Sequence, residues 1–191
     1  MTSKLKTDVL ETVSGSGTIA LTNQLSGMTA ESVPLLSAAQ MPSGSVLNVY
    51  HQSLPSTSIA TTSSSFVDTG LTITLTPVSA SSKFYITYTS APHLNTSSAA
   101  NTVYGIHFAH RGSAVTTIGG GDRQDGSSGW RTATQTTQGV DSPNTTSAIT
   151  YTVKMLTGSA GNNFNFHVGS HLNASHATGV ACQFTILEIK G

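Results

Sequence analysis

Charged residues are scarce in this chain, and their scarcity excludes one large class of function. They make up 8% of its 191 residues, and the formal net charge at pH 7 is zero, whereas an ordinary soluble domain contains roughly 25% charged residues. Nucleic-acid binding needs clustered lysine and arginine side chains that neutralise phosphates. The basic residues of this chain are scattered from Lys4 to Lys190. We therefore expect no nucleic-acid binding.

Cysteine and long apolar runs are nearly absent as well. Cys182 is the only cysteine, so it can form neither an intrachain disulfide nor, alone, a thiolate zinc site, and its place in "ACQF" favours a small buried residue. No apolar run approaches the roughly 20 residues of a membrane-spanning helix. The first residues, "MTSKLKTDVLET", contain acids where a signal peptide has an apolar core. We expect no membrane insertion and an intracellular site of synthesis.

Serine and threonine supply the polarity that charge does not. The chain contains 28 serine and 30 threonine residues, and 37% of it is hydrophobic, which is enough for a core in a chain of this length. Residues 1–41 show only weak patterning and cannot bury much by themselves, whereas the pattern becomes regular from residue 42. We therefore predict an extended N-terminal attachment arm at residues 1–41 and one β-sandwich domain at residues 42–191.

Apolar residues recur at every second position throughout the predicted domain. In "LTITL", apolar side chains alternate with threonine from Leu71 to Leu75, which places the two kinds on opposite faces of a strand. After Pro77 the alternation resumes from Phe84 to Tyr88. We predict that these two segments form an antiparallel pair joined by a loop of medium length.

Seven further segments follow the same pattern. They are "SVLNVYH", "TVYGIHFAH", "SAVTTIG", "GWRTATQTT", "ITYTVKML", "NFNFHVG" and "ACQFTILEI". In "TVYGIHFAH", Tyr104, Ile106 and Phe108 share one face, and Gly105 and His107 share the other. About nine strands without a long helical period predict an all-β fold, an antiparallel β-sandwich of jelly-roll-like topology.

The edges of such a sandwich are weakly protected. Threonine fits a solvent-facing strand position well, but few charges are left to guard the outermost strands against pairing with other chains. Closure of the sandwich or assembly with other copies must therefore cover these edges. We expect an oligomer.

Six segments, taken in order, carry a resemblance to a known family. They are "LKTDVLETVSGSGTI", "MPSGSVLNVYHQ", "SSSFVDTGLTITLTPVSASSKFYITYT", "FAHRGSAVTTIGGGD", "GVDSPNTTSAITYTVKM" and "FTILEIKG". With them, the chain resembles phage tail-fibre and virion-surface structural proteins of marine and cyanobacterial phages over nearly its whole length. None of these motifs is catalytic. The loop "GGGDRQDGSSGWRT" departs from the common pattern, which indicates a locally tailored surface.

The resemblance implies a location and a role in assembly. It implies a protein of the virion surface, made in the host cytoplasm and usually assembled as a homotrimer. We expect a non-enzymatic structural protein, either a tail fibre or a capsid decoration (cement) protein, attached to capsid or tail proteins by its N-terminal arm. One alternative is a receptor-binding adhesin that recognises a host surface polysaccharide, and another is a tail-associated depolymerase.

Candidate binding residues gather in the loop "GGGDRQDGSSGWRT". The indole of Trp130 suits a sugar ring, and the guanidinium groups of Arg123 and Arg131 suit acidic groups. These three residues are the candidates for glycan binding. Trp130 also begins an apparent strand, so a place in the core is the alternative.

Possible metal ligands occur in two places. Asp122 and Asp125, with neighbouring carbonyls, could bind calcium, although aspartate and glycine are also what an exposed turn needs. His167 and His171 would share one strand face, and a threefold axis would multiply them. The alternative is that both histidines are ordinary polar residues. No cofactor is expected.

Patterns typical of catalysis are missing from the sequence. No G-x-S-x-G motif occurs, and a Ser-His-Asp set can always be picked from so many serines without indicating a triad. Within the predicted domain at residues 42–191, only the carboxylates of Asp122 and Asp125 are close in sequence, whereas a glycosidase needs two across one cleft. We expect no enzymatic activity.

Overall fold

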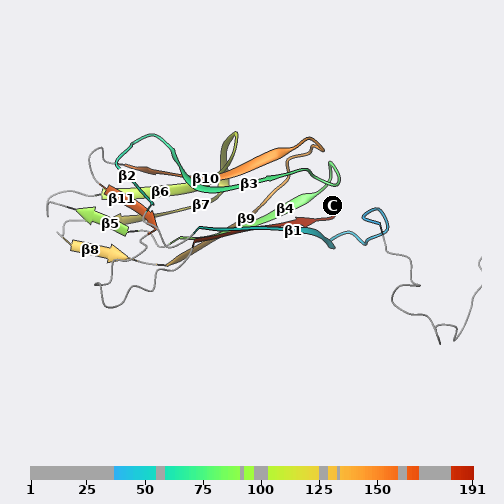
Figure 1. Cartoon of the computed structure of the whole chain (residues 1–191), viewed down its shortest axis with the longest axis horizontal. Coiled ribbons are helices and arrows are strands. Elements are labelled where there is room, and N and C mark those ends of the chain that lie inside the picture. The colour runs from blue at the N-terminus through green and yellow to red at the C-terminus, as the bar shows by residue number, and fades with distance from the viewer. Residues whose placement is uncertain are drawn as a thin grey trace, which may run out of the picture. The chain divides into compact units, whose positions relative to one another are not determined.

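Strands make up most of the part of the chain that the structure describes. The computed structural model describes residues 37–54, 59–90, 93–96, 103–124, 129–132, 134–158, 163–167 and 182–191, which form twelve β-strands and no helix (Figure 1). The arm predicted at residues 1–41 lies outside the described residues except for residues 37–41.

The strands form three sheets of four strands each. In spatial order, the β1 sheet contains β1 (Val46–Leu54), β12 (Cys182–Ile189), β4 (Lys83–Ser90) and β9 (Gln135–Asp141). The β3 sheet contains β3 (Val67–Leu75), β10 (Ile149–Thr157), β6 (Val103–Arg111) and β7 (Ser113–Gln124). The end sheet contains β2 (Ile59–Thr61), β11 (Asn163–His167), β5 (His93–Thr96) and β8 (Gly129–Thr132). The first two sheets are layered, and the end sheet lies at one end of them (Figure 1).

The described strands pair in a nested order: the first pairs with the last, the second with the second last, and so on to the middle pair. β1 pairs with β12, β2 with β11, β3 with β10, β4 with β9, β5 with β8 and β6 with β7, all antiparallel. The described strands therefore form one long ribbon closed by the β6–β7 hairpin. Further pairings, of β12 with β4, β11 with β5 and β10 with β6, fold this two-stranded ribbon back on itself and complete the three sheets. Two layered sheets rolled in this way form a jelly roll.

The predicted fold class is confirmed, and one predicted pairing is wrong. The segments "LTITL" and "KFYITYT" become β3 and β4, which lie in different sheets and do not pair with each other. The reason is that residues 76–82 cross from one sheet to the other, so proximity in sequence does not set the pairing. The predicted strand "GWRTATQTT" is divided into β8 and β9, and β2 and β5 were not predicted.

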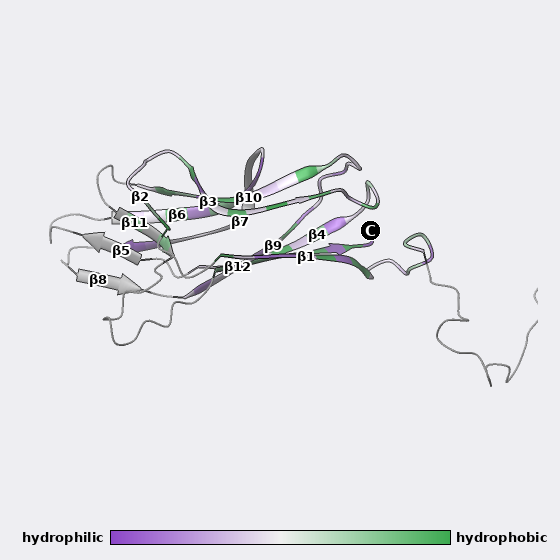
Figure 2. Ribbon diagram, in the orientation of Figure 1, coloured by the Kyte–Doolittle hydropathy of each residue, from purple (hydrophilic) through white to green (hydrophobic). Residues whose placement is uncertain are grey.

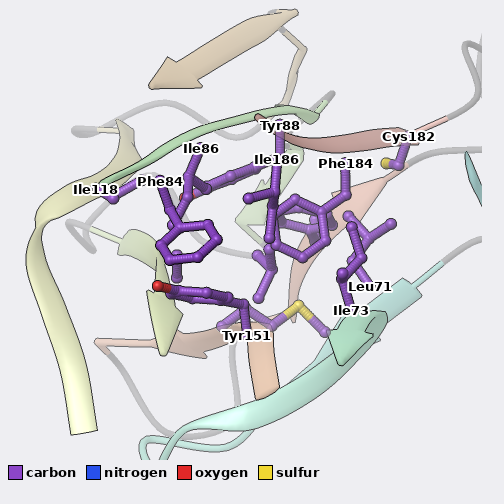
Figure 3. Close-up of a cluster of buried hydrophobic side chains, with 14 of the residues drawn as sticks. Leu71, Ile73, Phe84, Ile86, Tyr88, Ile118, Tyr151, Cys182, Phe184 and Ile186 are labelled. Atoms are coloured by element: carbon purple, nitrogen blue, oxygen red, sulfur yellow. The ribbon is translucent and has the colours of Figure 1, made fainter. Parts of the chain in front are cut away.

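Aromatic and branched side chains from both layers fill the space between them (Figure 3). The rings of Phe84, on β4, and Tyr151, on β10, meet across the layers with centroids 6.1 Å apart. The buried apolar residues are Leu71, Ile73, Leu75, Phe84, Ile86, Tyr88, Ala109, Ile118, Tyr151, Val153, Met155, Phe164, Phe166, Cys182, Phe184 and Ile186. The alternation predicted for β3, β4, β10 and β12 is therefore confirmed.

β6 turns its small and polar residues inward. Gly105 and His107 are buried, whereas Tyr104 is 43% exposed and Phe108 is half-buried. A Cβ atom at Gly105 would collide with the ring of Phe164. The absence of a side chain at Gly105 thus makes room for an aromatic ring from the end sheet.

Glutamine side chains bridge both open edges of the sandwich. Gln52 of β1 donates from Nε2 to the carbonyl of Gly70 at 3.2 Å and accepts from the N–H of Thr72 at 2.6 Å, so its amide acts as a strand partner for β3. On the opposite edge, Gln135 of β9 donates to the carbonyl of Gly121 in β7 at 3.1 Å. Because unpaired edges invite pairing with other chains, these bridges supply part of the protection that we expected from assembly.

Candidate functional site

The polypeptide enters the β1 sheet beside the end of β12. The backbone N–H of Gly44 donates to the carbonyl of Lys190 at 2.8 Å, and the N–H of Lys190 donates to the carbonyl of Ser45 at 2.9 Å. The ammonium group of Lys190 donates to the carbonyls of Ala39, at 2.8 Å, and Met41. Lys190 therefore holds the segment before β1 with its main chain and its side chain together. We call this arrangement the entry clamp.

A buried carboxylate supports the same end of the β1 sheet. Glu188, on β12, is fully buried. It accepts hydrogen bonds from Asn48 Nδ2 at 2.8 Å, from the hydroxyl of Tyr50 at 3.4 Å and from the N–H of Val78 at 2.6 Å. Burial and the negative charge of Glu188 raise the pKa of Tyr50. Glu188 thus ties β1 and the β3–β4 loop to β12.

Four side chains form an apolar row across the outer face of the β1 sheet at this end. Val49, Leu187, Tyr85 and Val140 are partners in successive strands β1, β12, β4 and β9. Val49 is 64% exposed and Val140 is 51% exposed, and Leu187 and Tyr85 are half-buried. The set, which we call the apolar row, spans the whole width of the sheet.

The neighbouring rows set the limits of this apolar surface. On the side of the entry clamp, the next row contains Val46, Ile189 and Lys83, which are successive register partners. Val46 is 47% exposed, and Lys83 places a charge at the rim. On the other side, a row of polar residues crosses the same four strands. These residues are His51, Thr185, Thr87 and Gln138. In Figure 2, β1 contains clearly hydrophobic (green) stretches.

The outer face of the β3 sheet carries paired hydroxyl groups on β3 and β10, and apolar side chains on β6, where Tyr104 is 43% exposed and Phe108 is half-buried. The hydroxyls of Thr72 and Thr152 lie 3.2 Å apart, and those of Thr74 and Thr150 lie 2.9 Å apart. These side chains belong to the threonine-rich face that the sequence predicted. The part of this face formed by β3 and β10 therefore differs in chemistry from the apolar row.

Asp141 connects the layers through charged and neutral hydrogen bonds. It accepts from Arg111 Nε at 2.7 Å and Nη2 at 3.2 Å, and from the hydroxyl of Tyr151 at 2.7 Å. Burial alone would raise the pKa of Asp141, but the hydrogen bonds from Arg111, Tyr151 and the N–H of Ser142, with the charge of Arg111, bring it below its usual value. This carboxylate fastens β9 to the β3 sheet.

His107 is a buried histidine with neutral partners. It is fully buried, with Nδ1 2.8 Å from the hydroxyl of Tyr88 and Nε2 3.4 Å from Gln135 Oε1. Burial lowers the pKa of His107 to about 4, so the imidazole is neutral at pH 7. The ring holds β6 against β4 and β9.

A shallow, open groove lies between β7 and β9. Gly119–Gly121 and Gln135–Gln138 line it, and none of these residues is charged. A Cβ atom at Gly120 would crowd the ring of His107 and the hydroxyl of Thr137. Glycine therefore lets β7 pass closely over the buried imidazole.

The predicted glycan-binding residues belong to β7 and β8. Arg123 is exposed near the end of β7 and pairs through its main chain with Tyr104. Trp130 and Arg131 lie in β8, which pairs with β5 of the end sheet. The strand predicted at Trp130 is confirmed. The side chains of Trp130 and Arg131 lie outside the described parts, so glycan binding at these residues stays a prediction.

The predicted metal ligands are described only in part. Asp122 is half-buried in β7 and accepts from the N–H of Arg123 at 3.0 Å. Asp125 and His171 lie outside the described residues, and only the main chain of His167 is described, in β11. Over the described ranges, no group of three or more histidine, cysteine, aspartate or glutamate side chains could hold a metal ion. Both metal sites stay predictions.

Sequence reasoning missed the entry clamp and the apolar row. The row depends on the register between strands, and local alternation does not encode register. One signal was present for Glu188, because a carboxylate stands in the inward-facing set of "FTILEI". The prediction for Cys182 is confirmed: it is 1% exposed, and burial raises its pKa to about 12.

Comparisons with known proteins give a distant structural likeness. No family model and no curated protein matches the chain. A solved structure, the infectious bursal disease virus VP2 subviral particle, is similar at 11% sequence identity and a TM-score of 0.37. The match covers 83% of this chain and 42% of that chain, so this chain spans less than half the length of that protein. A likeness this low carries no argument about function.

Among the residues that the structure describes, no helix is long and apolar enough to cross a membrane.

Proposed function

We propose that the protein is a non-enzymatic structural component of a phage particle, exposed on the virion surface and attached to other virion proteins through its N-terminal segment. The resemblance of six of its segments to phage tail-fibre and virion-surface proteins supports this role. The jelly roll is also compatible with it, because viral capsid proteins use this fold, as do lectins and cupins.

The observation that carries the proposal is the entry clamp. Backbone hydrogen bonds join Gly44 and Ser45 to Lys190, and the Lys190 side chain holds the carbonyls of Ala39 and Met41. Lys190 directly follows β12, which lies between β1 and β4 in the sheet. A pulling force applied to the chain before residue 37 is therefore transmitted by several hydrogen bonds to β12, an inner strand of the β1 sheet. A domain anchored to a particle by its N-terminal segment needs such a connection.

At finer detail, we propose a homotrimeric tail fibre or capsid decoration protein. Several attached copies multiply weak contacts with the particle by avidity, so each arm needs only modest affinity. The number of copies per particle separates the two positions, because a decoration protein follows the copy number of the major capsid protein and a fibre stays far below it. Quantitative mass spectrometry of purified particles measures this ratio.

Deletion of residues 1–36 tests the attachment. This deletion keeps the entry clamp and the complete described sandwich, so we expect a folded protein that no longer sediments with particles. The matched control is full-length Trp130→Ala, which should still sediment with them. Retained attachment of the deleted chain, with circular dichroism showing an intact fold, would contradict the proposal. Loss of host adsorption by Trp130→Ala particles would favour the adhesin instead.

A further inference from the structure

We propose that the apolar row is the surface through which copies of this chain meet one another around a common axis that runs along the strands of the β1 sheet. The inference deepens the proposed architectural function, on which it rests, by naming the contact surface and its occupant. It begins from the four residues Val49, Leu187, Tyr85 and Val140, of which two are more than half exposed.

The shape of the apolar surface fits a contact with another protein. Single exposed apolar residues are common on protein surfaces, whereas apolar residues that form a continuous patch mark interaction sites. The row is continuous, because its four members are register partners in adjacent strands. Val46 and Ile189 extend it by part of a further row, which ends at the charged side chain of Lys83. On the outer face of the β3 sheet, β3 and β10 carry paired threonine hydroxyls, and the apolar side chains of β6 are interrupted by glycines in the neighbouring β7. No row of four apolar partners therefore crosses the described part of that face.

The chemistry around the row favours a second copy as the occupant. Groups that lie close to the symmetry axis of an assembly come near their own copies. Charged groups repel under that condition, whereas hydroxyl and amide groups both donate and accept hydrogen bonds. The polar row beside the apolar row consists of His51, Thr185, Thr87 and Gln138. Threonine and glutamine side chains are compatible with their own copies in this way.

The position of the row also fits an assembly of copies. The row lies at the end of the β1 sheet that carries the entry clamp at Lys190. An axis along the strands keeps this end of every copy on the same side of the assembly. All N-terminal segments then start from one side, as attachment to one particle surface requires. The homotrimer implied by the resemblance would place three such rows around the axis.

The experiment compares charge substitutions on the two outer faces. Val49→Asp with Val140→Asp places carboxylates in the proposed contact, and Thr72→Asp with Thr150→Asp places them at exposed strand positions of the opposite face. Sedimentation velocity of the full chain measures the oligomer. We expect the native chain and the threonine control to be oligomeric. We expect the valine variant to dissociate, with a dissociation constant raised at least about tenfold, because like charges meet in the contact.

Cysteine labelling provides a readout that does not depend on dissociation. Cys182 is buried, so a new surface cysteine is the accessible thiol in the described part of the folded chain. Val49→Cys should react with maleimide slowly in the oligomer, and Thr72→Cys should react quickly. Circular dichroism confirms that each variant is folded, and Val49→Ser replaces the charge variant if Val49→Asp does not fold.

Three outcomes would overturn the inference. They are a monomeric native chain, an oligomer that persists in the folded valine variant, and equally fast labelling at Val49→Cys and Thr72→Cys. A monomeric chain that loses particle attachment through Val49→Asp would assign the row to another virion protein. The proposed function is tested separately, because deletion of residues 1–36 removes the attachment segment and leaves the apolar row intact.

Discussion

Buried His107 makes the stability of the protein depend on pH in a defined range. The folded protein holds this imidazole with a pKa of about 4, against 6.5 for the ordinary group. Between these two values the unfolded chain binds more protons than the folded one, so acid favours unfolding. The contribution of His107 to stability is therefore complete above pH 6.5 and is lost as the pH falls towards 4.

The size of this effect follows from the pKa difference. One pKa unit corresponds to about 1.4 kcal/mol, so the full change is about 3 kcal/mol and the part between pH 7 and pH 4.5 is about 2.5 kcal/mol. Against a total stability of about 5–15 kcal/mol, this loss is readily measured. His110 contributes in the same direction, because burial lowers its pKa as well.

Replacement of His107 by glutamine removes the titrating group and keeps an amide that can hydrogen-bond the hydroxyl of Tyr88. Urea unfolding, followed by circular dichroism at fixed protein concentration, gives the free energy of unfolding at pH 7 and pH 4.5. We expect the difference between these values to shrink by about 2–3 kcal/mol in His107→Gln relative to the native chain. The control His110→Gln should keep the His107 contribution. An unchanged difference in His107→Gln would refute the reasoning, because it would mean that the folded protein protonates His107 freely.

Three further predictions concern other buried groups. Asp141→Asn should lower the free energy of unfolding in urea at pH 7 by about 1–3 kcal/mol, because Arg111 loses its charged partner. It should also reduce the loss of stability below the usual aspartate pKa of 3.8, where the native carboxylate becomes protonated. An unchanged loss of stability in acid would contradict this. Gly105→Ala should lower stability by about 1–3 kcal/mol because the new methyl group overpacks the Phe164 ring, and a neutral result would show that the ring can move. Cys182 should react with a thiol reagent only at the rate of unfolding, since it is 1% exposed and its pKa is raised to about 12; rapid labelling of the native chain would count against its burial.

Local alternation predicted the core well where one face of a strand is plainly apolar. Leu71 and Tyr151 belong to such strands, and both are buried. β6 shows the limit of the method, because alternation divides it into two faces and does not say which one turns inward. There the face with Gly105 and His107 turns inward. The reason is nonlocal, since the Phe164 ring of the end sheet fills the space beside Gly105.

Pairing and surface function were harder to predict for the same physical reason. β3 lies near β4 in sequence, but it pairs with β10, whose position depends on the whole ribbon. The apolar row likewise exists only through the register of four strands. The entry clamp at Lys190 depends on a contact between the two ends of the domain. None of these features leaves a pattern within one stretch of sequence, whereas fold class does, through strand alternation and the turn residues between strands.

The pairing of first strand with last has a consequence for how the protein is made. Of the described strands, a ribosome releases β1 first and β12 last, yet these two strands are hydrogen-bonded partners, and β12 also separates β1 from β4. The β1 sheet therefore cannot close until the final strand has emerged, whereas the β6–β7 hairpin can form midway through synthesis. Such high contact order slows folding and leaves strand edges exposed on the nascent chain. A chain cut before Cys182 would keep the hairpin and lose the strand that joins β1 to the rest of its sheet, so assembly of the β1 sheet depends on β12.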